Sequence, residues 1–243
     1  MNAEAKNTIR RKVRERYTKA ATDSGCCDSD ASCAIGYSPA ELTRIPAESV
    51  LGLGSGNPVL HAELRHGETV VDLGSGAGID VFLSSELVGS HGRAIGIDMT
   101  PTMVVRASNA AALHHIENAS FLLAPIERLP LPDASADVVL SNCVINLSPD
   151  KPAVFAEAWR ILKPGGRLVI SDVVQERDLG LIEDDCDCVG NAMVRTKYLE
   201  TIRREGFVAI QIKEDRPWRI GPTGIEASAL TLTAKKPDRD ISE

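Results

Sequence analysis

The chain has 243 residues, of which 43% are hydrophobic and 25% are charged, and its formal net charge is −7. This length suits one α/β domain with small additions, and the acidic balance gives no electrostatic reason to expect nucleic acid or an anionic membrane as a partner. The N-terminus lacks the apolar core of a signal peptide, and no apolar run approaches the ~20 residues of a membrane span. We therefore expect a cytoplasmic protein whose six cysteines are mostly thiols.

The chain begins with polar and small residues that precede its regular part. Residues 2–20 have many charges and a helical pattern, and are predicted to form a cap across the domain. Residues 21–37 are predicted to be a loop of small residues that holds three of the six cysteines. A short helix should follow, because Ser38 can cap it, Pro39 suits its first position and Glu41 lies three residues after the cap.

Apolar strands alternate with helices from residue 68 onward. The predicted elements are strand 68–73, helix 79–89, strand 93–98, helix 100–116, strands 119–124 and 136–142, helix 150–166, strand 167–174, helix 195–207 and strands 208–215 and 226–236. Such alternation predicts a parallel sheet with helices on both faces. The short link between the last two strands predicts an antiparallel pair at one edge. Residues 1–67 are expected to form the N-terminal cap, cysteine loop and substrate-side segment, 68–236 the cofactor-binding domain, and 237–243 a tail.

The tetrapeptide Leu-Gly-Ser-Gly occurs twice, at 53–56 and at 73–76. The second copy follows a buried strand and precedes a helix, and an acidic residue ends the next strand. Glycines let the backbone turn sharply and let a ligand approach it, and an acidic residue at that place can accept hydrogen bonds from ribose hydroxyls. The cofactor contacts predicted from this arrangement are Asp72, Gly74, Ser75, Gly76, Gly78 and Asp98.

The spacing of these glycines favours one cofactor over another. A dinucleotide fingerprint is G-x-G-x-x-G, whereas this loop is G-x-G-x-G. No third glycine has the dinucleotide spacing, which favours S-adenosylmethionine, a cofactor without a pyrophosphate. The alternative is a purely structural turn between strand and helix.

The segments "IERLPLPDASADVVLSN" and "AWRILKPGGRLVISD" make residues 68–236 resemble the Class I S-adenosylmethionine-dependent methyltransferases. This resemblance implies a Rossmann-like fold with a seven-stranded, mostly parallel sheet. It also implies that Ile126 and Glu127 lie near the adenine, that Met99 packs on the adenine face, and that Asn142 belongs to the cofactor site. Tyr17 resembles a tyrosine that closes over the cofactor in such proteins, with simple lid packing as the alternative.

Within that class the chain resembles the arsenite methyltransferases more narrowly. The matching segments are "GYSPAELTRIPAESVLGLGSGNP", "DLGSGAGIDVFLSSELVGSHGRAIGIDMTPTM", "SNCVINLSPDK" and "CVGNAMVRTKYLETIRREGF". The resemblance assigns the first tetrapeptide to the substrate side, where Ser55 stands at the position of a family cysteine. It implies that Cys143 and Cys188 bind trivalent arsenic. The other candidate thiols are Cys26, Cys27, Cys33 and Cys186, each of which could equally be structural.

Thiolates suit trivalent arsenic because soft ligands bind soft centres. The lone pair of thiolate-bound arsenic can attack the sulfonium methyl, so catalysis would consist of holding the two groups in line. With Ser55 in place of a cysteine, two substrates stay open. One is a monosubstituted arsenical such as methylarsonous acid, and the other is arsenite with a third thiol from the N-terminal loop or a small molecule. A thiol reductant of the glutathione or thioredoxin type is the expected partner, and detoxification or organoarsenical biosynthesis the expected role.

Two other functions stay open. A methyltransferase acting on oxygen, nitrogen or carbon of a metabolite would need a base near the methyl group, and "SNCVINL" contains no histidine. A non-catalytic thiol-based arsenic binder would not need the cofactor loop. The cysteine spacings lack the patterns of zinc sites, and we expect the five histidines to be structural or solvated.

Overall fold

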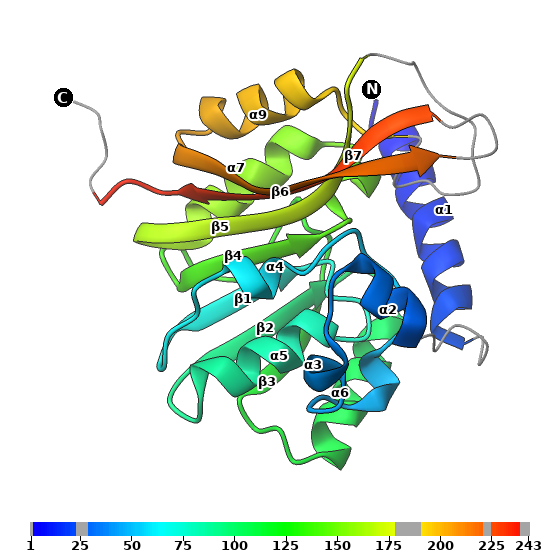
Figure 1. Ribbon diagram of the computed structural model, residues 1–243, viewed down its shortest axis with the longest axis vertical. Coiled ribbons are helices and arrows are strands. Elements are labelled where there is room, and N and C mark those ends of the chain that lie inside the picture. Colours follow the sequence, from blue (N-terminus) through cyan, green and yellow to red (C-terminus); the bar gives the residue numbers. More distant parts are fainter. Residues whose placement is uncertain (1, 23–28, 178–190, 221–224, 239–243) are drawn as a thin grey trace.

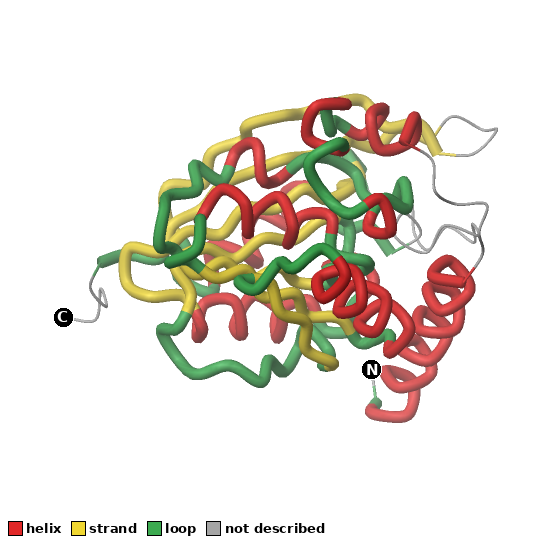
Figure 2. Tube along the Cα trace, turned by 90° about the horizontal axis from the view of Figure 1, so that it is seen from below, coloured by secondary structure: helices red, strands yellow, loops and turns green. Residues whose placement is uncertain are grey.

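The computed structural model describes residues 2–22, 29–177, 191–220 and 225–238. A seven-stranded sheet with the strand order β3-β2-β1-β4-β5-β7-β6 forms its centre, and helices lie on both faces of the sheet (Figures 1 and 2). The strands are Thr69–Leu73 (β1), Arg93–Asp98 (β2), Ala119–Leu123 (β3), Ala136–Asn142 (β4), Leu162–Gln175 (β5), Val208–Ile220 (β6) and Ile225–Lys235 (β7).

Strands β1 to β5 pair in parallel, whereas β7 is antiparallel to both β5 and β6. The predicted Rossmann-like, mostly parallel sheet with an antiparallel pair at one edge is therefore confirmed. The helices are α1 (Ala3–Thr22), α2 (Ser29–Ile35), α3 (Pro39–Leu42), α4 (Pro58–His61), α5 (Ile79–Val88), α6 (Pro101–Leu113), α7 (Lys151–Ile161) and α9 (Arg195–Arg204), with 3₁₀ turns η1 (Ala47–Ser49) and η2 (Ile145–Leu147).

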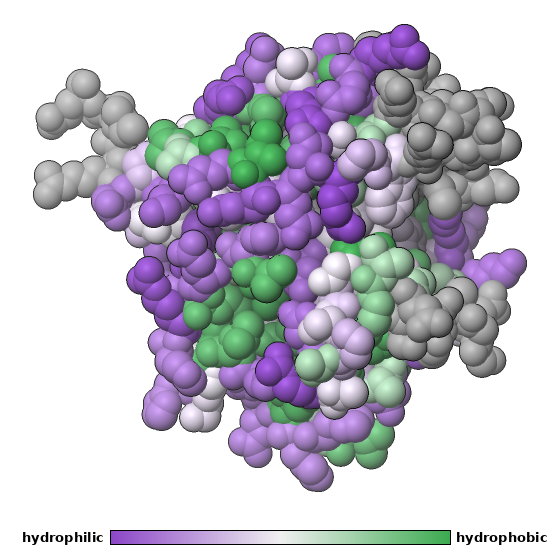
Figure 3. Space-filling view, viewed as in Figure 1, coloured by the Kyte–Doolittle hydropathy of each residue, from purple (hydrophilic) through white to green (hydrophobic). Residues whose placement is uncertain are grey.

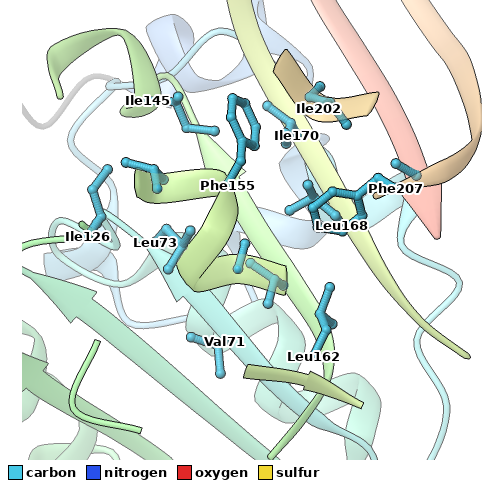
Figure 4. Packing of buried hydrophobic residues seen from close by; sticks show 14 of the residues in the cluster. Val71, Leu73, Ile126, Ile145, Phe155, Leu162, Leu168, Ile170, Ile202 and Phe207 are labelled. Atoms are coloured by element: carbon cyan, nitrogen blue, oxygen red, sulfur yellow. The ribbon is translucent and has the colours of Figure 1, made fainter. Parts of the chain in front are cut away.

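The sheet is buried on both faces, which explains the continuous apolar runs of its strands. Successive residues of β1 alternate between two hydrophobic clusters: Val71 joins Phe155 of α7 on one face, and Val70 joins Phe82 of α5 on the other. Figure 4 shows the first cluster, in which Phe155 lies among side chains of the sheet. Burial of each such side chain contributes about 1.5–3 kcal/mol, so the sheet provides a firm support for the loops at its ends.

The second cluster includes the segment that precedes β1. Tyr37, Ile45 and Val59 are buried in it together with Phe82. Helix α3 has the predicted capping box at Ser38. Residues before the sheet thus pack directly on its α5 face, while the division of the chain at residues 67 and 68 stays a prediction.

The bounds of several segments differ from the sequence prediction by three or more residues. The helix predicted over 195–207 ends at Arg204, and the strand predicted over 208–215 continues to Ile220. Within the predicted loop 21–37 the structure has helix α2, whose residues Ser32 and Ile35 face inward at helical spacing. The helix predicted over 150–166 ends at Ile161, and β5 begins at Leu162. Pro164 explains the early end, since a proline disfavours helical backbone at the residue before it. Helix α6 likewise ends at Leu113 rather than at 116.

The surface carries separate apolar patches among hydrophilic side chains on the face drawn in Figure 3. Its large exposed apolar side chains within the described ranges are Leu53, Leu60, Leu87, Val105, Leu113, Leu123, Val208 and Ile212. Among the described residues, no helix combines the length and the apolar character needed to cross a bilayer.

Candidate active site

A cavity of about 460 Å³ opens at the carboxyl ends of β1, β2 and β4. Ligands of open α/β sheets bind at this edge. Side chains of α1 and α2, the segment 49–54 and the loops after the three strands form its wall. The predicted cofactor residues that line it are Tyr17, Asp72, Gly74, Ser75, Gly76, Asp98, Met99, Ile126, Glu127 and Asn142.

The glycine loop turns sharply between β1 and α5. The amides of Gly74 and Ser75 both donate to the Ile97 carbonyl, at 2.7 and 3.0 Å, which ties the loop to β2. Gly74 and Gly76 have φ angles of 69° and 52°, in the left-handed region that favours glycine. A Cβ added to Gly76 would meet nothing within 4 Å, so the backbone there faces open cavity that a ligand can approach.

Gly78 has a different place from the other two glycines. It does not line the cavity. It precedes α5 with a left-handed φ of 96°, and an added Cβ would lie 2.8 Å from Phe121 and 2.9 Å from Phe82. Its role in the structure is therefore close packing of the helix against β3.

Asp98 ends β2 beside the glycine loop. Its carboxylate accepts hydrogen bonds from the amides of Gly76 at 3.0 Å and Thr100 at 2.7 Å. Burial raises the pKa of Asp98, and these hydrogen bonds oppose the rise. The carboxylate is thus fixed at the cavity wall, where its remaining lone pairs can accept hydrogen bonds from a ligand.

Glu127 lies on the cavity wall under helix α1. It accepts a hydrogen bond from the Ser148 hydroxyl at 2.7 Å and pairs with Arg10 of α1 at 3.3 Å. Tyr17, on the same helix, packs with a small cluster that contains Met103 and Ala77. Helix α1 therefore covers the cavity from the side of Glu127, as the expected cap would.

Asn142 connects the two Leu-Gly-Ser-Gly segments. Its side-chain oxygen accepts the Ser55 amide at 3.0 Å, and its side-chain amide donates to the Gly56 carbonyl at 2.8 Å. The same amide lies 2.9 Å from the Tyr37 hydroxyl and 3.2 Å from a carboxylate oxygen of Asp80. The first tetrapeptide is thus attached to the end of β4 rather than forming a second glycine loop.

Cys143 follows Asn142 directly and lines the cavity. It is 9% exposed, and its amide donates to the Ser171 carbonyl of β5 at 2.8 Å. Its φ of 57° lies in the left-handed region. Ser55 does not line the cavity, although its amide is bonded to Asn142. Its hydroxyl is buried and has no hydrogen-bond partner among the described residues.

The other predicted thiols have different positions. Cys33 lies on α2, half-buried, and does not line the cavity. Cys26, Cys27, Cys186 and Cys188 lie outside the described residues. Within the described ranges no group of three histidine, cysteine, aspartate or glutamate side chains could hold a metal ion.

Two buried carboxylates were missed by sequence reasoning, and one of them, Asp80, belongs to the site. Asp80 lines the cavity, 1% exposed, and accepts a hydrogen bond from the Tyr37 hydroxyl at 2.7 Å. Asp172 accepts hydrogen bonds from Asn146 at 2.8 Å and Tyr198 at 3.1 Å. The available signal was an acidic residue inside each apolar run, which is unusual at a buried position.

The residues of this cavity fit S-adenosylmethionine. Gly76 leaves room at the loop, Asp98 offers acceptors at the ribose position, and the buried carboxylates suit a cationic ligand. The glycines at 74, 76 and 78 have the spacing G-x-G-x-G rather than the dinucleotide spacing G-x-G-x-x-G.

Comparison with known proteins decides the family. A family model described as a methyltransferase domain matches residues 64–217. An arsenite methyltransferase of Halobacterium salinarum is 37% identical, in an alignment that covers 95% of this chain and 67% of the relative. The chain belongs to the arsenite methyltransferase family. A second member, from Aquipseudomonas alcaligenes, is 38% identical over 84% of this chain and 64% of its own length.

The structures of arsenite methyltransferases agree with this assignment. The arsenic(III) S-adenosylmethionine methyltransferase of Chlamydomonas reinhardtii matches with a TM-score of 0.68 and 30% identity, covering 87% of this chain and 74% of that one. The cofactor of this arsenite methyltransferase family member is S-adenosylmethionine. The chain spans about two thirds of the length of the two prokaryotic relatives. The [4+2]-cyclase SpnF, at 19% identity and a TM-score of 0.61, shares the fold alone.

Proposed function

We propose that this chain transfers a methyl group from S-adenosylmethionine to trivalent arsenic that is held by thiolates. The observation that carries the proposal is the position of Cys143, whose side chain lines the same cavity as the glycine loop and Asp98. A thiolate ligand and a methyl donor can therefore meet in one closed space. Membership of the arsenite methyltransferase family supports an arsenical as the substrate.

The reaction requires the protein mainly to position the arsenical and the methyl donor relative to each other. S-adenosylmethionine supplies an electrophilic methyl group on a sulfonium sulfur. The arsenic lone pair forms the new As–C bond while the C–S bond breaks with its electrons on sulfur. Arsenic thereby loses two electrons in the formal count, and a thiol reductant returns them by forming a disulfide. The protein has only to hold the lone pair in line with the methyl carbon.

The roles proposed for the cofactor residues follow their places in the cavity. Asp98 would accept hydrogen bonds from the ribose. Gly74 would let the loop turn against Val144, and Gly76 would let the cofactor approach the backbone. The adenine would lie near Met99, Ile126 and Glu127. Tyr17 and Asn142 would close the cofactor site at its two ends.

Cys188 is proposed as the second arsenic ligand, and the third ligand position distinguishes the two substrates. A hydroxyl is a poor ligand for a soft centre, and the buried Ser55 hydroxyl has no hydrogen-bond partner within the described ranges. Two thiolates suit a monosubstituted arsenical such as methylarsonous acid. Arsenite would require a third thiol from Cys26, Cys27, Cys33 or Cys186, or from a small molecule.

The reductant and the setting belong to the same proposal. A thiol reductant of the glutathione or thioredoxin type would return arsenic to the trivalent state. A cytoplasmic location suits a chemistry that depends on reduced thiols. The biological role would be arsenic detoxification or organoarsenical biosynthesis.

Product speciation tests the proposal. The protein is incubated with S-adenosylmethionine and a thiol reductant, with arsenite in one tube and methylarsonous acid in the other, and methylated arsenic is followed by chromatography with elemental detection. Faster turnover of the methylated substrate is the expected result. Equal rates would indicate a third thiol, and no product from either substrate would contradict the proposal.

Two cysteine variants make the test specific. Cys143→Ser should lower methylation by about 100-fold or more, because the arsenic loses the ligand that positions it, while titrated S-adenosylmethionine still binds. Cys188→Ser should have the same phenotype. Cys33→Ser should leave methylarsonous acid turnover unchanged, because its side chain does not line the cavity. A metabolite methyltransferase would be insensitive to both active-site thiols, and a non-catalytic binder need not bind the cofactor.

A further inference from the structure

Asp72 and Asp80 form a pair of buried carboxylates in the cavity. Asp72 lies near the end of β1 and is 3% exposed, and Asp80 lies in the first turn of α5 and is 1% exposed. The hydrogen-bond donors to Asp80 are the neutral groups of Tyr37 and Asn142. Within the described ranges, Asp72 has no hydrogen-bond donor and no cationic partner. In the described part of the chain, neither carboxylate forms an ion pair with a cationic side chain, and burial disfavours the charged form of both.

The charged groups around this pair are mostly acidic. The titratable side chains that face the pair or share its cavity are Tyr37 and Glu41 from the segment before β1, Asp98 from β2, Glu127 and Cys143 from the loops after β3 and β4, and Arg10 and Arg16 from α1. Arg10 is paired with Glu127. The floor of the cavity is therefore negative, which favours a positively charged occupant.

The position of the pair matches the positive part of the cofactor. Strand β1 lies between β2 and β4, so Asp72 lies between the edge that carries Asp98 and the edge that carries Cys143. With its ribose at Asp98 and its methyl group toward Cys143, S-adenosylmethionine would place its sulfonium and ammonium groups above the end of β1. This orientation rests on the proposed function.

In the absence of such a cation, burial and the nearby negative charges favour a protonated pair. Burial raises the pKa of Asp72, and the charges of Asp80 and Asp98 raise it further. Burial also raises the pKa of Asp80, to about 6, against the hydrogen bonds from Tyr37 and Asn142. Like charges that share a buried site titrate together.

We propose that Asp72 and Asp80 act as one carboxyl pair that senses the charge of the cofactor and thereby favours S-adenosylmethionine over its product, S-adenosylhomocysteine. The two molecules differ by one methyl group and by the positive charge of the sulfonium. The substrate molecule stabilises the fully ionised pair and displaces its proton to solvent. After methyl transfer the positive charge is gone, the pair takes a proton from solvent, and the product is held less tightly.

The sign of the pH dependence follows from this exchange. A cation lowers the pKa of the pair, so binding releases a proton at a pH between the pKa of the bound state and that of the free state. Affinity for S-adenosylmethionine should rise with pH through this range and become constant above it. S-adenosylhomocysteine, which keeps only the ammonium, should release fewer protons.

Isothermal titration calorimetry of the full chain tests the proposal. Both molecules are titrated between about pH 5 and 8.5, a range that spans the pKa of about 6 of Asp80. Buffers with different ionisation enthalpies give the number of protons released per binding event. We expect more protons released by S-adenosylmethionine than by S-adenosylhomocysteine. In Asp80→Asn the affinity ratio of the two should fall about tenfold, the size of effect that a nearby charge exerts.

Two further variants keep the test decisive. Tyr37→Phe removes a donor to Asp80 and keeps both carboxylates, so proton release should move to higher pH. Glu86→Gln is the matched control, because Glu86 has the same charge, lies exposed on the same helix α5 and does not line the cavity, and the affinity ratio should change less than about twofold.

Equal proton release by both molecules would overturn the proposal. So would an unchanged affinity ratio in Asp80→Asn that still binds S-adenosylhomocysteine. If this variant does not fold, the pH shift in Tyr37→Phe decides. None of these measurements uses an arsenical, so a failure to methylate arsenic would contradict the proposed substrate and leave the inference about the pair standing.

Discussion

The two Leu-Gly-Ser-Gly segments have the same four residues and different structures. At 73–76 the glycines take left-handed φ angles and leave open space above Gly76. At 53–56 the space is filled: a Cβ on Gly56 would lie 2.7 Å from the Ser171 hydroxyl and 3.1 Å from that of Thr231. The first segment is bonded through Asn142 to the end of β4, whereas the second is bonded to β2.

Glycine residues therefore have two opposite structural roles in one site. Gly76 in the second segment leaves room for a ligand, and Gly56 in the first lets the backbone approach a neighbouring strand. The strand and helix on either side of the second copy decide its role, because they place the loop at the cavity edge and bond its amides to Ile97 and Asp98 of β2. The first copy has no strand before it, and its neighbours in space come from β4, β5 and β7.

The largest expected effect comes from filling the open glycine. Gly76→Val would place a branched side chain in the cavity and should weaken S-adenosylmethionine binding by about 100-fold, as overpacking of a filled site does. The left-handed backbone adds a strain of about 1–2 kcal/mol. Gly67→Val is a matched control, since Gly67 also has a positive φ and open space but does not line the cavity. Equal losses of binding in both variants would contradict the role of the second segment.

A smaller effect is expected from the corresponding change in the first segment. Gly56→Ala would push the segment away from Ser171 and disturb its bonds to Asn142. Arsenical turnover should fall about tenfold, because misplacement of a positioning segment weakens alignment, while S-adenosylmethionine affinity changes little. Steady-state turnover and cofactor titration measure the two separately. A matching loss of cofactor affinity would mean that both segments serve the cofactor.

The variant Ser55→Cys tests whether the first segment determines which arsenical is the preferred substrate. The added thiol, next to Gly54 of the cavity wall, would provide a third ligand and should raise arsenite turnover relative to methylarsonous acid by about tenfold, equivalent to about 1.4 kcal/mol of binding free energy. Stability should change by less than about 1 kcal/mol, because the hydroxyl that is lost has no hydrogen-bond partner in the described part of the chain. Ser55→Ala serves as the control without a thiol. An unchanged preference in Ser55→Cys would show that this position does not set the substrate.

The smallest effect on turnover is expected at Asp172, which supports the same end of the sheet. Burial raises its pKa from 3.8 to about 7. Between these values the folded state holds a proton that the unfolded state lacks, so the contribution of Asp172 to stability is full below about pH 4 and lost as the pH rises to about 7. Relative to Asp172→Asn, wild-type stability should fall by about 1.4 kcal/mol per pH unit in this window. Urea unfolding at several pH values measures the slope, and parallel curves would contradict the assignment.

The sequence predicted the sheet, its antiparallel edge and the glycine loop, because each depends on local periodicity and spacing. It did not predict the bonds of Asn142 to Ser55 and Asp80, residues 87 and 62 positions away. Such contacts follow from the way in which the segment before β1 packs on the sheet, which no local pattern records. Gly78 illustrates the same limit: it belongs to the glycine motif, yet its neighbours are the rings of Phe82 and Phe121.

The left-handed backbone at Cys143 has a consequence for the evolution of this fold. A residue with a Cβ at a φ of 57° is strained by about 1–2 kcal/mol relative to glycine. Selection for thermal stability alone would therefore tend to replace this thiol by glycine or asparagine. A library of variants screened for heat resistance alone should lose the cysteine early, whereas selection for the proposed turnover of arsenicals should retain it.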